Sequence, residues 1–205
     1  MFVLTVDQRS STGRPDLVPD LLRHLRDVLT GRPGVVVPFD RTVGDEVQGV
    51  LDDPGTVVDV VLDLLRDGGW SVGLGVGAVD EPLPAVSREA SGDAFVRARD
   101  AVEQAKSRAA TAPVAVRGGA PGRAEEVEAL LRLLARVADR RTARGWEAVD
   151  ELARVGGTQK DVARALGVTE QAVSQRLRSA LWPEEAAVRP LVVRLLGELE
   201  EEVDG

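Results

Sequence analysis

Cysteine is absent from this 205-residue chain, and histidine occurs once. Without cysteine, disulfide bonds, zinc–thiolate centres and thiol chemistry are excluded, and the single histidine argues against a histidine-based catalytic centre. Carboxylates are therefore the side chains left to bind a metal ion. Aromatic residues make up only 3% of the chain, so we expect valine, leucine and alanine to form the hydrophobic cores.

A basic leader and long apolar runs are also missing. The first residues, MFVLTVD, carry no basic side chain and reach an acidic one at Asp7, which is typical neither of a signal peptide nor of a membrane-spanning helix. We therefore expect a cytoplasmic protein that has no membrane partner. The net charge of −8 argues against indiscriminate binding to nucleic acid, although such a total can conceal a locally basic segment.

The first 118 residues alternate between strand-like and helix-like segments. Hydrophobic spacing predicts strands at 2–7, 34–43, 46–51, 70–79 and 113–117, and helices at 16–29, 55–67 and 92–109. In chain order, the six elements from residue 2 to residue 79 match the split βαβ, or ferredoxin-like, unit, in which helices lie on one face of an antiparallel sheet. Glycines alternate with apolar residues in WSVGLGVGAV at 70–79, which indicates that something approaches this strand closely.

The sequence GGAPG at 118–122 interrupts this pattern and is expected to separate two domains, residues 1–118 and 119–205. Everything after it is predicted to be helical, at 124–144, at 146–155, within 158–178, and in a last helix whose first turn contains Pro190. We therefore predict an α+β protein, with a ferredoxin-like N-terminal domain and an all-α C-terminal domain.

Residues 158–178, TQKDVARALGVTEQAVSQRLR, have the layout of a helix-turn-helix. Thr158 with Asp161, and Thr169 alone, can cap the two helix starts, and Gly167 can adopt the left-handed conformation of the turn. The shared core is expected to contain Val162, Leu166, Val168, Val173 and Leu177. The alternative is a helical hairpin that contacts another protein.

The second of these helices is predicted to read base edges in the major groove of double-stranded DNA. The candidates on its outward side are Thr169, Glu170, Gln171, Ser174, Gln175 and Arg178. Candidates for phosphate contacts are Arg140, Arg141, Arg144, Lys160, Arg164 and Arg176. Residues 140–180 contain eight basic and five acidic residues, a net charge of +3 within an acidic protein. The segment resembles the DNA-reading region of sigma factors and LuxR-type regulators.

Two aspartates are expected to meet at one end of the predicted sheet. Asp7 ends the first strand and Asp45 lies at the tip of the next hairpin, and the central strands of a ferredoxin-like sheet are neighbours. Mg²⁺ takes oxygen ligands, commonly carboxylates together with nucleotide phosphates, so this pair, with Glu46 as a third candidate, predicts a metal–nucleotide site. The alternative is that Asp45 is a turn residue and Asp7 a loop cap.

The N-terminal half resembles the catalytic core of class III nucleotidyl cyclases and diguanylate cyclases. The shared order is a strand ending in aspartate, a helix, a hairpin with Gly-Asp-Glu at 44–46, a helix and a glycine-rich strand. This resemblance implies that Asp7 and Asp45 bind metal, and that Arg41 and Gly44 contact a purine nucleotide. More narrowly, GDEVQGVL, VGLGVGAV and SGDAFVRARDAVEQAK resemble the SatD family, small bacterial proteins that pair such a domain with a C-terminal helix-turn-helix.

The cyclase pattern is incomplete in the helix after the glycine-rich strand. Cyclases place an Asn and an Arg there, one turn apart, to stabilise charge on the transferring phosphates. Val96 and Asp100 stand at the matching positions of this chain. Arg97 and Arg99 are candidates for the same contact, with a solvated helix face as the alternative. We therefore expect a domain that binds a nucleotide without turning it over.

These patterns predict a DNA-binding transcriptional regulator whose N-terminal domain senses a purine nucleotide with Mg²⁺. A homodimer is expected, because cyclase-like domains pair and helix-turn-helix proteins commonly bind two half-sites. The leucine- and valine-rich last helix is the candidate contact. Two alternatives stay open: an active nucleotidyl cyclase or nucleotidyltransferase held on DNA, and a regulator whose N-terminal domain is only a dimerisation scaffold.

Overall fold

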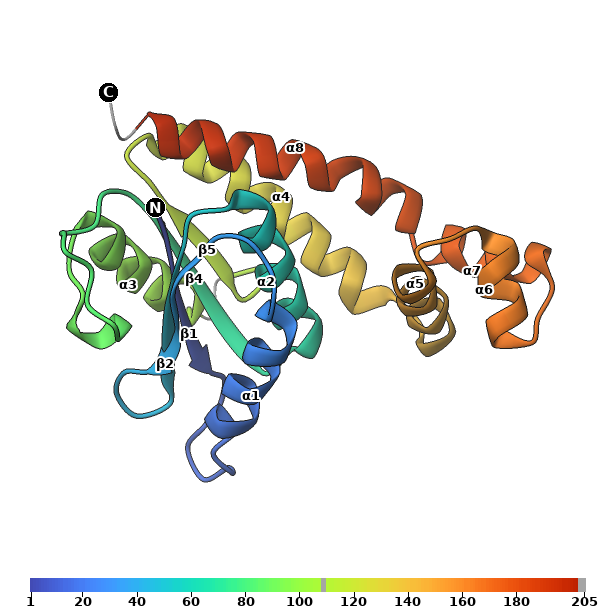
Figure 1. The fold of residues 1–205 in the computed structure, drawn as a ribbon, viewed down its shortest axis with the longest axis horizontal. Helices are drawn as coiled ribbons and strands as arrows, with labels where there is room; N and C mark the ends of the chain where they lie inside the picture. Colours follow the sequence, from blue (N-terminus) through green and yellow to red (C-terminus); the bar gives the residue numbers. More distant parts are fainter. Residues whose placement is uncertain (108–109, 203–205) are drawn as a thin grey trace. The chain divides into compact units, whose positions relative to one another are not determined.

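The computed structural model describes residues 1–107 and 110–202 and combines one five-stranded sheet with α-helices (Figure 1), which confirms the mixed α+β class. The strands are β1 (Phe2–Gln8), β2 (Val35–Arg41), β3 (Glu46–Leu51), β4 (Trp70–Val76) and β5 (Val114–Arg117). The helices are α1 (Val18–Leu29), α2 (Pro54–Asp67), α3 (Asp93–Ala105), α4 (Pro121–Arg140), α5 (Ala143–Val155), α6 (Gln159–Leu166), α7 (Glu170–Ser179) and α8 (Trp182–Glu201). None of these helices has the length and apolar character that crossing a membrane requires.

Strand β1 lies inside the sheet, whose order is β2-β3-β1-β4-β5. It pairs antiparallel with β3 and with β4, whereas β5 runs parallel to β4. In this register Asp7 is opposite Glu46 of β3 and Ser71 of β4. The end of β1 therefore meets the beginnings of both neighbouring strands.

Helices cover both faces of the sheet. Figure 1 shows α1 and α2 on one side of the sheet and α3 on the other. Helix α3 comes after the six elements that form the predicted ferredoxin-like unit. On the α3 side, Val3 and Val50 pack with Ala94, Phe95 and Ala98. Because β1 is covered from both sides, it is buried from Phe2 to Val6 without alternation.

Two glycines of β4 let the backbone of α3 lie directly against the sheet. A Cβ atom at Gly75 would lie 2.1 Å from the carbonyl oxygen of Ala94, and one at Gly73 would lie 2.3 Å from the backbone nitrogen of Val102. The close approach predicted from the glycine-rich strand is confirmed, and the approaching element is α3. The predicted helix at 92–109 ends at Ala105, and its last two residues lie outside the described part of the chain.

The chain forms two compact units, a sheet unit (Met1–Arg132 and Val192–Gly205) and a helical unit (Leu133–Leu191). The limits of these units differ from the predicted boundary at 118/119. The reason is that the first part of α4, which follows that boundary, is bonded to the sheet. Glu128 of α4 accepts a hydrogen bond from the backbone N–H of Val116 at 2.9 Å. Arg123 of α4 forms an ion pair with Glu198 of α8.

Pro190 lies inside α8, so the prediction that it belongs to the first turn of the last helix is wrong. The helix begins earlier, at Trp182. A proline within a helix removes the hydrogen bond to the carbonyl four residues before it, here that of Ala186. Ala186 is exposed, so water can solvate the unpaired carbonyl oxygen.

Candidate functional site

The three carboxylates predicted to bind a metal ion are neighbours at one end of the sheet. Asp7 of β1 is paired with Glu46 of β3, and Asp45 lies in the turn just before β3. Burial is the main cause that raises the pKa of Asp7, and the negative charges of Asp45 and Glu46 raise it further. The structure therefore brings the predicted set within electrostatic reach of one another.

A lysine from α3 binds this group of carboxylates. The Lys106 ammonium donates hydrogen bonds to Asp7 Oδ2 at 3.0 Å and to Glu103 Oε1 at 2.8 Å. Desolvation opposes its charge, but these hydrogen bonds outweigh that effect and the pKa of Lys106 is raised. The side chain of Asp7 is the more deeply buried, 16% exposed against 33% for Lys106, which explains why burial outweighs the ion pair at Asp7.

This arrangement does not fit a bound divalent cation as it stands. Within residues 1–107 and 110–202, no group of three or more histidine, cysteine, aspartate or glutamate side chains is placed to hold a metal ion. Asp7 already binds Lys106, and Glu46 accepts a hydrogen bond from the hydroxyl of Thr42. A magnesium ion bound by Asp7, Asp45 and Glu46 stays a prediction.

Two of the three arginines predicted to contact a nucleotide already hold partners within the chain. Arg41 donates from Nη2 to both carboxylate oxygens of Asp16, at 2.8 and 2.6 Å, and from Nη1 to the carbonyl oxygen of Gly44 at 3.1 Å. The hydrogen bond from Arg41 holds the pKa of Asp16 below its usual value. Arg97 donates to the carbonyl oxygen of Val76 at 2.7 Å, whereas Arg99 is exposed on α3.

Asp16, Glu103 and Lys106 are not among the predicted site residues. Lys106 and Asp7 are 99 residues apart, and the packing of α3 against β4 and β1 brings them together. One signal was present in the sequence, because Ala98, Val102 and Lys106 recur every four residues and so share the sheet-facing side of one helix.

In the helical unit, α5, α6 and α7 share one core. Its buried members are Ala148, Val149, Val162, Ala163, Val173, Leu177 and Ala180, and the half-buried Leu166 and Val168 pack against them. All five apolar residues predicted for this core are therefore in contact with it or part of it.

The predicted caps and turn of this helix pair are confirmed. Asp161 accepts a hydrogen bond from the backbone N–H of Thr158 at 3.0 Å, and Thr169 Oγ1 accepts one from that of Ala172 at 3.1 Å. The hydrogen bonds from Thr158 lower the pKa of Asp161. Gly167, between the helices, has a left-handed φ of 65°.

The polar side chains predicted to meet DNA lie mostly at the surface. Exposed members of this set are Lys160, Thr169, Glu170, Gln171, Gln175 and Arg178, while Ser174 is half-buried. Arg178 donates to the carbonyl and hydroxyl oxygens of Ser174, at 3.4 and 3.3 Å. Glu170, Gln171 and Gln175 form no side-chain hydrogen bond or ion pair with the rest of the described chain.

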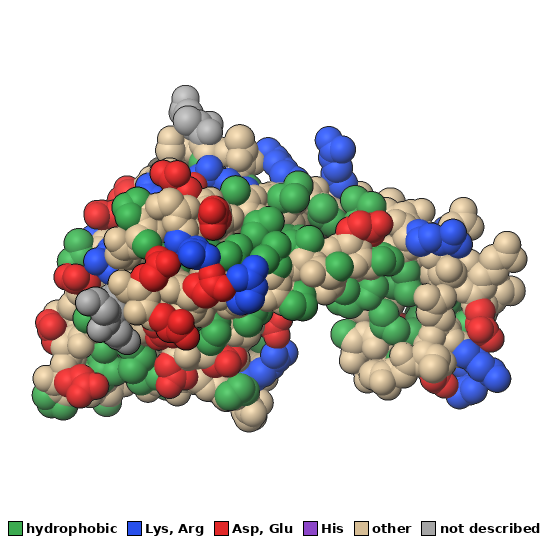
Figure 2. All heavy atoms as spheres, turned by 90° about the horizontal axis from the view of Figure 1, so that it is seen from above, with side chains coloured by type: hydrophobic (Ala, Val, Ile, Leu, Met, Phe, Trp, Pro, Cys, Tyr) green, Lys and Arg blue, Asp and Glu red, His purple; other side chains and the backbone are tan. Residues whose placement is uncertain are grey.

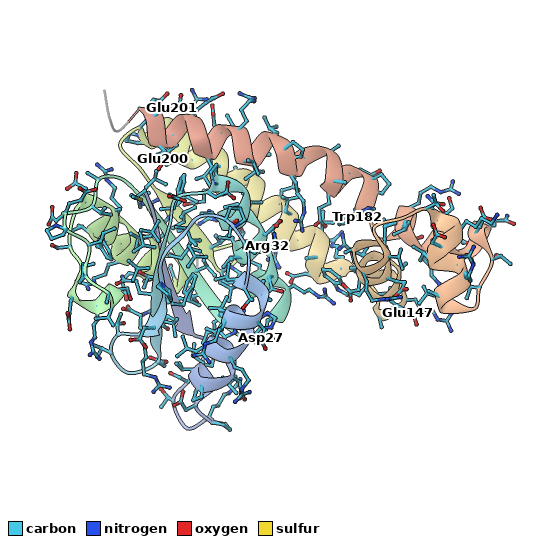
Figure 3. The ribbon with its side chains drawn as sticks, in the orientation of Figure 1. Asp27, Arg32, Glu147, Trp182, Glu200 and Glu201 are labelled. Carbon is cyan, nitrogen blue, oxygen red and sulfur yellow. The ribbon has the colours of Figure 1, made fainter. Side chains whose placement is uncertain are left out.

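Two arginines predicted to contact phosphates are engaged inside the helical unit. The side chain of Arg141 is 0% exposed and donates to Glu185 at 2.6 Å, so its assignment to DNA is wrong. Its guanidinium lies 4.3 Å from the ring centre of Trp146. Arg176 is 21% exposed and pairs with Glu147 of α5, labelled in Figure 3, at 2.6 Å. Three other candidates, Arg140, Arg144 and Arg164, are exposed.

No protein-family model, curated protein or solved structure matches this chain. The likeness to cyclases and to the SatD family therefore depends on the motifs quoted above.

Proposed function

We propose that this chain is a DNA-binding transcriptional regulator in which α6 and α7 form a helix-turn-helix and α7 enters the major groove. The observation that carries this proposal is the exposed polar face of α7, whose side chains hold no internal partner at Glu170, Gln171 and Gln175. Gln171 and Gln175 are one turn apart and share that face. Glutamine amides can form paired hydrogen bonds with adenine, so both are suited to base readout.

Charge distribution supports the same assignment. The helical unit contains ten basic and eight acidic residues, a net charge of +2 within a chain of net charge −8. On the face of the sheet unit drawn in Figure 2, acidic side chains are more prominent than basic ones. A nucleic-acid backbone is therefore attracted to the helical unit and repelled by the sheet unit.

The alternative, a helical hairpin that contacts another protein, is less well supported. A protein contact of that kind needs apolar anchors on the outward face of the helix. On α7 the apolar residues Val173 and Leu177 are buried in the core, and the outward positions are polar.

For the sheet unit we propose a ferredoxin-like domain related to nucleotidyl cyclases and to the SatD family. The βαββαβ order, the antiparallel pairing of β1 with β3 and β4, and the carboxylates at the end of β1 support this relationship. Val96 and Asp100 replace the catalytic Asn and Arg of cyclases, which favours a regulatory domain over an enzyme. A purine nucleotide is its proposed ligand, and a homodimer with exposed Leu191 of α8 near the contact is the proposed DNA-binding form.

The test of DNA binding is selection of fragments from a random double-stranded pool by the full chain, followed by titration of the enriched sequence. We expect Gln171→Ala and Gln175→Ala each to weaken binding to that sequence by about 1–3 kcal/mol, with little change for unrelated DNA. Glu125→Ala, an exposed substitution on α4 in the sheet unit, is the control. Failure to enrich any sequence, or an equal loss on unrelated DNA, would contradict base readout by α7.

Nucleotide sensing is tested separately on the enriched fragment. The fragment is titrated with the wild-type chain and with Asp45→Asn, each with and without ATP or GTP. A ligand shifts DNA affinity only if it binds the DNA-competent and incompetent states unequally. Identical DNA affinities under all conditions would remove the sensing role and leave the sheet unit as a scaffold.

A further inference from the structure

The carboxylate site at the end of β1 already contains a cation that belongs to the chain. Lys106 Nζ lies between Asp7 Oδ2, at 3.0 Å, and Glu103 Oε1, at 2.8 Å. These are the distances of charge-assisted hydrogen bonds, so the ammonium is bound to both carboxylates. The negative charges of Asp45 and Glu46 act on the same aspartate.

The position of Lys106 at the C-terminal end of α3 favours a positive charge at this place. Lys106 is the residue that ends the helix, and its backbone N–H donates to the carbonyl oxygen of Val102. The last carbonyl groups of a helix carry partial negative charge, which stabilises a cation beside them. The close packing of α3 at Gly73 and Gly75 fixes this helix end relative to β1.

A divalent cation bound by Asp7 would share this carboxylate with the ammonium of Lys106, which already binds Oδ2. Two positive charges close together in a partly buried site repel each other. Binding of one cation therefore weakens binding of the other.

We propose that Lys106 is the resident cation of this site and weakens its binding of divalent metal ions in the wild-type chain. Lys106 neutralises part of the acidic group without any bound ion, which accounts for the poor fit of a metal in the structure. Loss of the lysine charge strengthens metal binding, because Asp7 and Glu103 then lose the counter-charge that Lys106 supplies. The inference rests on the ligand-binding role proposed for the sheet unit, and it is independent of DNA binding.

The test measures Mn²⁺ binding by the full chain. Binding is detected as a loss of the free Mn²⁺ signal in electron paramagnetic resonance. Wild type is compared with Lys106→Met, with Lys106→Arg, which keeps the charge, and with the double variant Lys106→Met/Asp7→Asn. We expect Lys106→Met to bind Mn²⁺ roughly tenfold or more tightly than wild type, since one neighbouring charge changes the proton affinity of a carboxylate by a similar factor. Lys106→Arg is expected to behave like wild type, and the double variant to lose the gain.

The outcomes separate this inference from the proposed function. Equal Mn²⁺ affinity of wild type and Lys106→Met overturns the inference, whether both bind tightly or neither binds. A gain that persists in the double variant also overturns it, because the ion would then not be at Asp7. Circular dichroism checks that each variant is folded, and Lys106→Gln replaces Lys106→Met if that variant fails to fold. Binding of the enriched DNA by the same variants reports on the proposed function alone.

Discussion

The end of β1 and the outer face of α7 are both rich in polar side chains, but they differ in how those side chains are engaged. At the sheet end, Asp7 binds Lys106 and Arg41 binds Asp16. On α7, Gln171 and Gln175 are exposed and hold no partner in the described chain. Polar groups already paired internally must break those contacts before they bind anything else, whereas Gln171 and Gln175 exchange only water.

This difference indicates which of the predicted site residues can bind an external partner without first breaking internal contacts. Exposed amides lose little when they form new hydrogen bonds, because their water contacts are replaced in kind. Separating a half-buried carboxylate from its ammonium leaves a desolvated charge and is costly. The exposed amides of α7 are therefore more available to an external partner than the paired carboxylate at the end of β1.

The largest effect is expected where the sheet unit depends on backbone packing. Gly75→Ala places a Cβ atom 2.1 Å from the carbonyl oxygen of Ala94, so α3 must move away from β4. We expect the free energy of unfolding to fall by about 3 kcal/mol or more, at the upper end of overpacking costs. Urea unfolding followed by circular dichroism measures this loss.

Gly122→Ala on α4 is the matched control for that substitution, because a Cβ atom there meets nothing within 4 Å. It should leave stability unchanged or raise it slightly. Similar stabilities for Gly75→Ala and Gly122→Ala would contradict the close packing of α3.

A somewhat smaller loss is expected from a cavity in the helical unit. Leu177 is 2% exposed within the core of α5, α6 and α7, and Leu177→Ala should lower the free energy of unfolding by about 2–5 kcal/mol. Trp146 and Trp182 pack against this core, so their fluorescence reports the transition in a Trp70→Phe background. Leu133→Ala, at a position 56% exposed, is the control, and an equally large loss there would show that the core is misplaced.

The two glycine turns allow a direct comparison of the units. Gly44 and Gly167 have φ values of +62° and +65°, and a Cβ atom at either position meets no atom within 4 Å. Because only the left-handed backbone is at issue, each change to alanine should cost about 1–2 kcal/mol. Chemical unfolding of both variants checks this. Only Gly167→Ala should also weaken binding to the enriched DNA, and a larger effect of Gly44→Ala on that binding would reverse the assignment of the units.

The smallest effects are two opposite pH dependences. The pKa of Asp161 is lowered by hydrogen bonds from Thr158, so its contribution to stability is present above the ordinary value of 3.8 and is lost as the pH falls through the lowered value. The pKa of Asp7 is raised by burial, so its contribution is present below 3.8 and is lost as the pH rises through the raised value.

Thermal unfolding of Asp161→Asn and Asp7→Asn against wild type, from acid to neutral pH, measures both contributions. The advantage of wild type over Asp161→Asn should grow as the pH rises, and its advantage over Asp7→Asn should shrink. Two differences that change in the same direction would show that the two aspartates do not have opposite environments.

Local patterns in the sequence predicted the elements and the caps and turn of α6 and α7, because caps, turns and hydrophobic spacing act over a few residues. Thr158, Asp161, Gly167 and Thr169 have the expected local roles. The closeness of Asp7 to Asp45 and Glu46 also followed from the expected strand order, as the effect of both charges on Asp7 shows.

Such local patterns could not predict contacts between segments that are far apart in the sequence. Lys106 reaches Asp7 only once α3 packs on the sheet, and the buried Arg141 binds Glu185, which is 44 residues further along the chain. The predicted place of Pro190 in a first helical turn was wrong, because water can solvate the carbonyl oxygen of Ala186 and so a proline is tolerated inside α8. The division into units likewise depends on Glu128 and Arg123, whose partners are in β5 and α8.

Hydrogen exchange by mass spectrometry, on the full chain with and without the enriched DNA, tests the central claim most directly. We predict that DNA slows exchange mainly in the peptides covering 158–179, where α6, the turn and α7 lie, and leaves those covering 2–8 and 40–51 unchanged. Protection at the sheet end without protection at α7 would contradict the account.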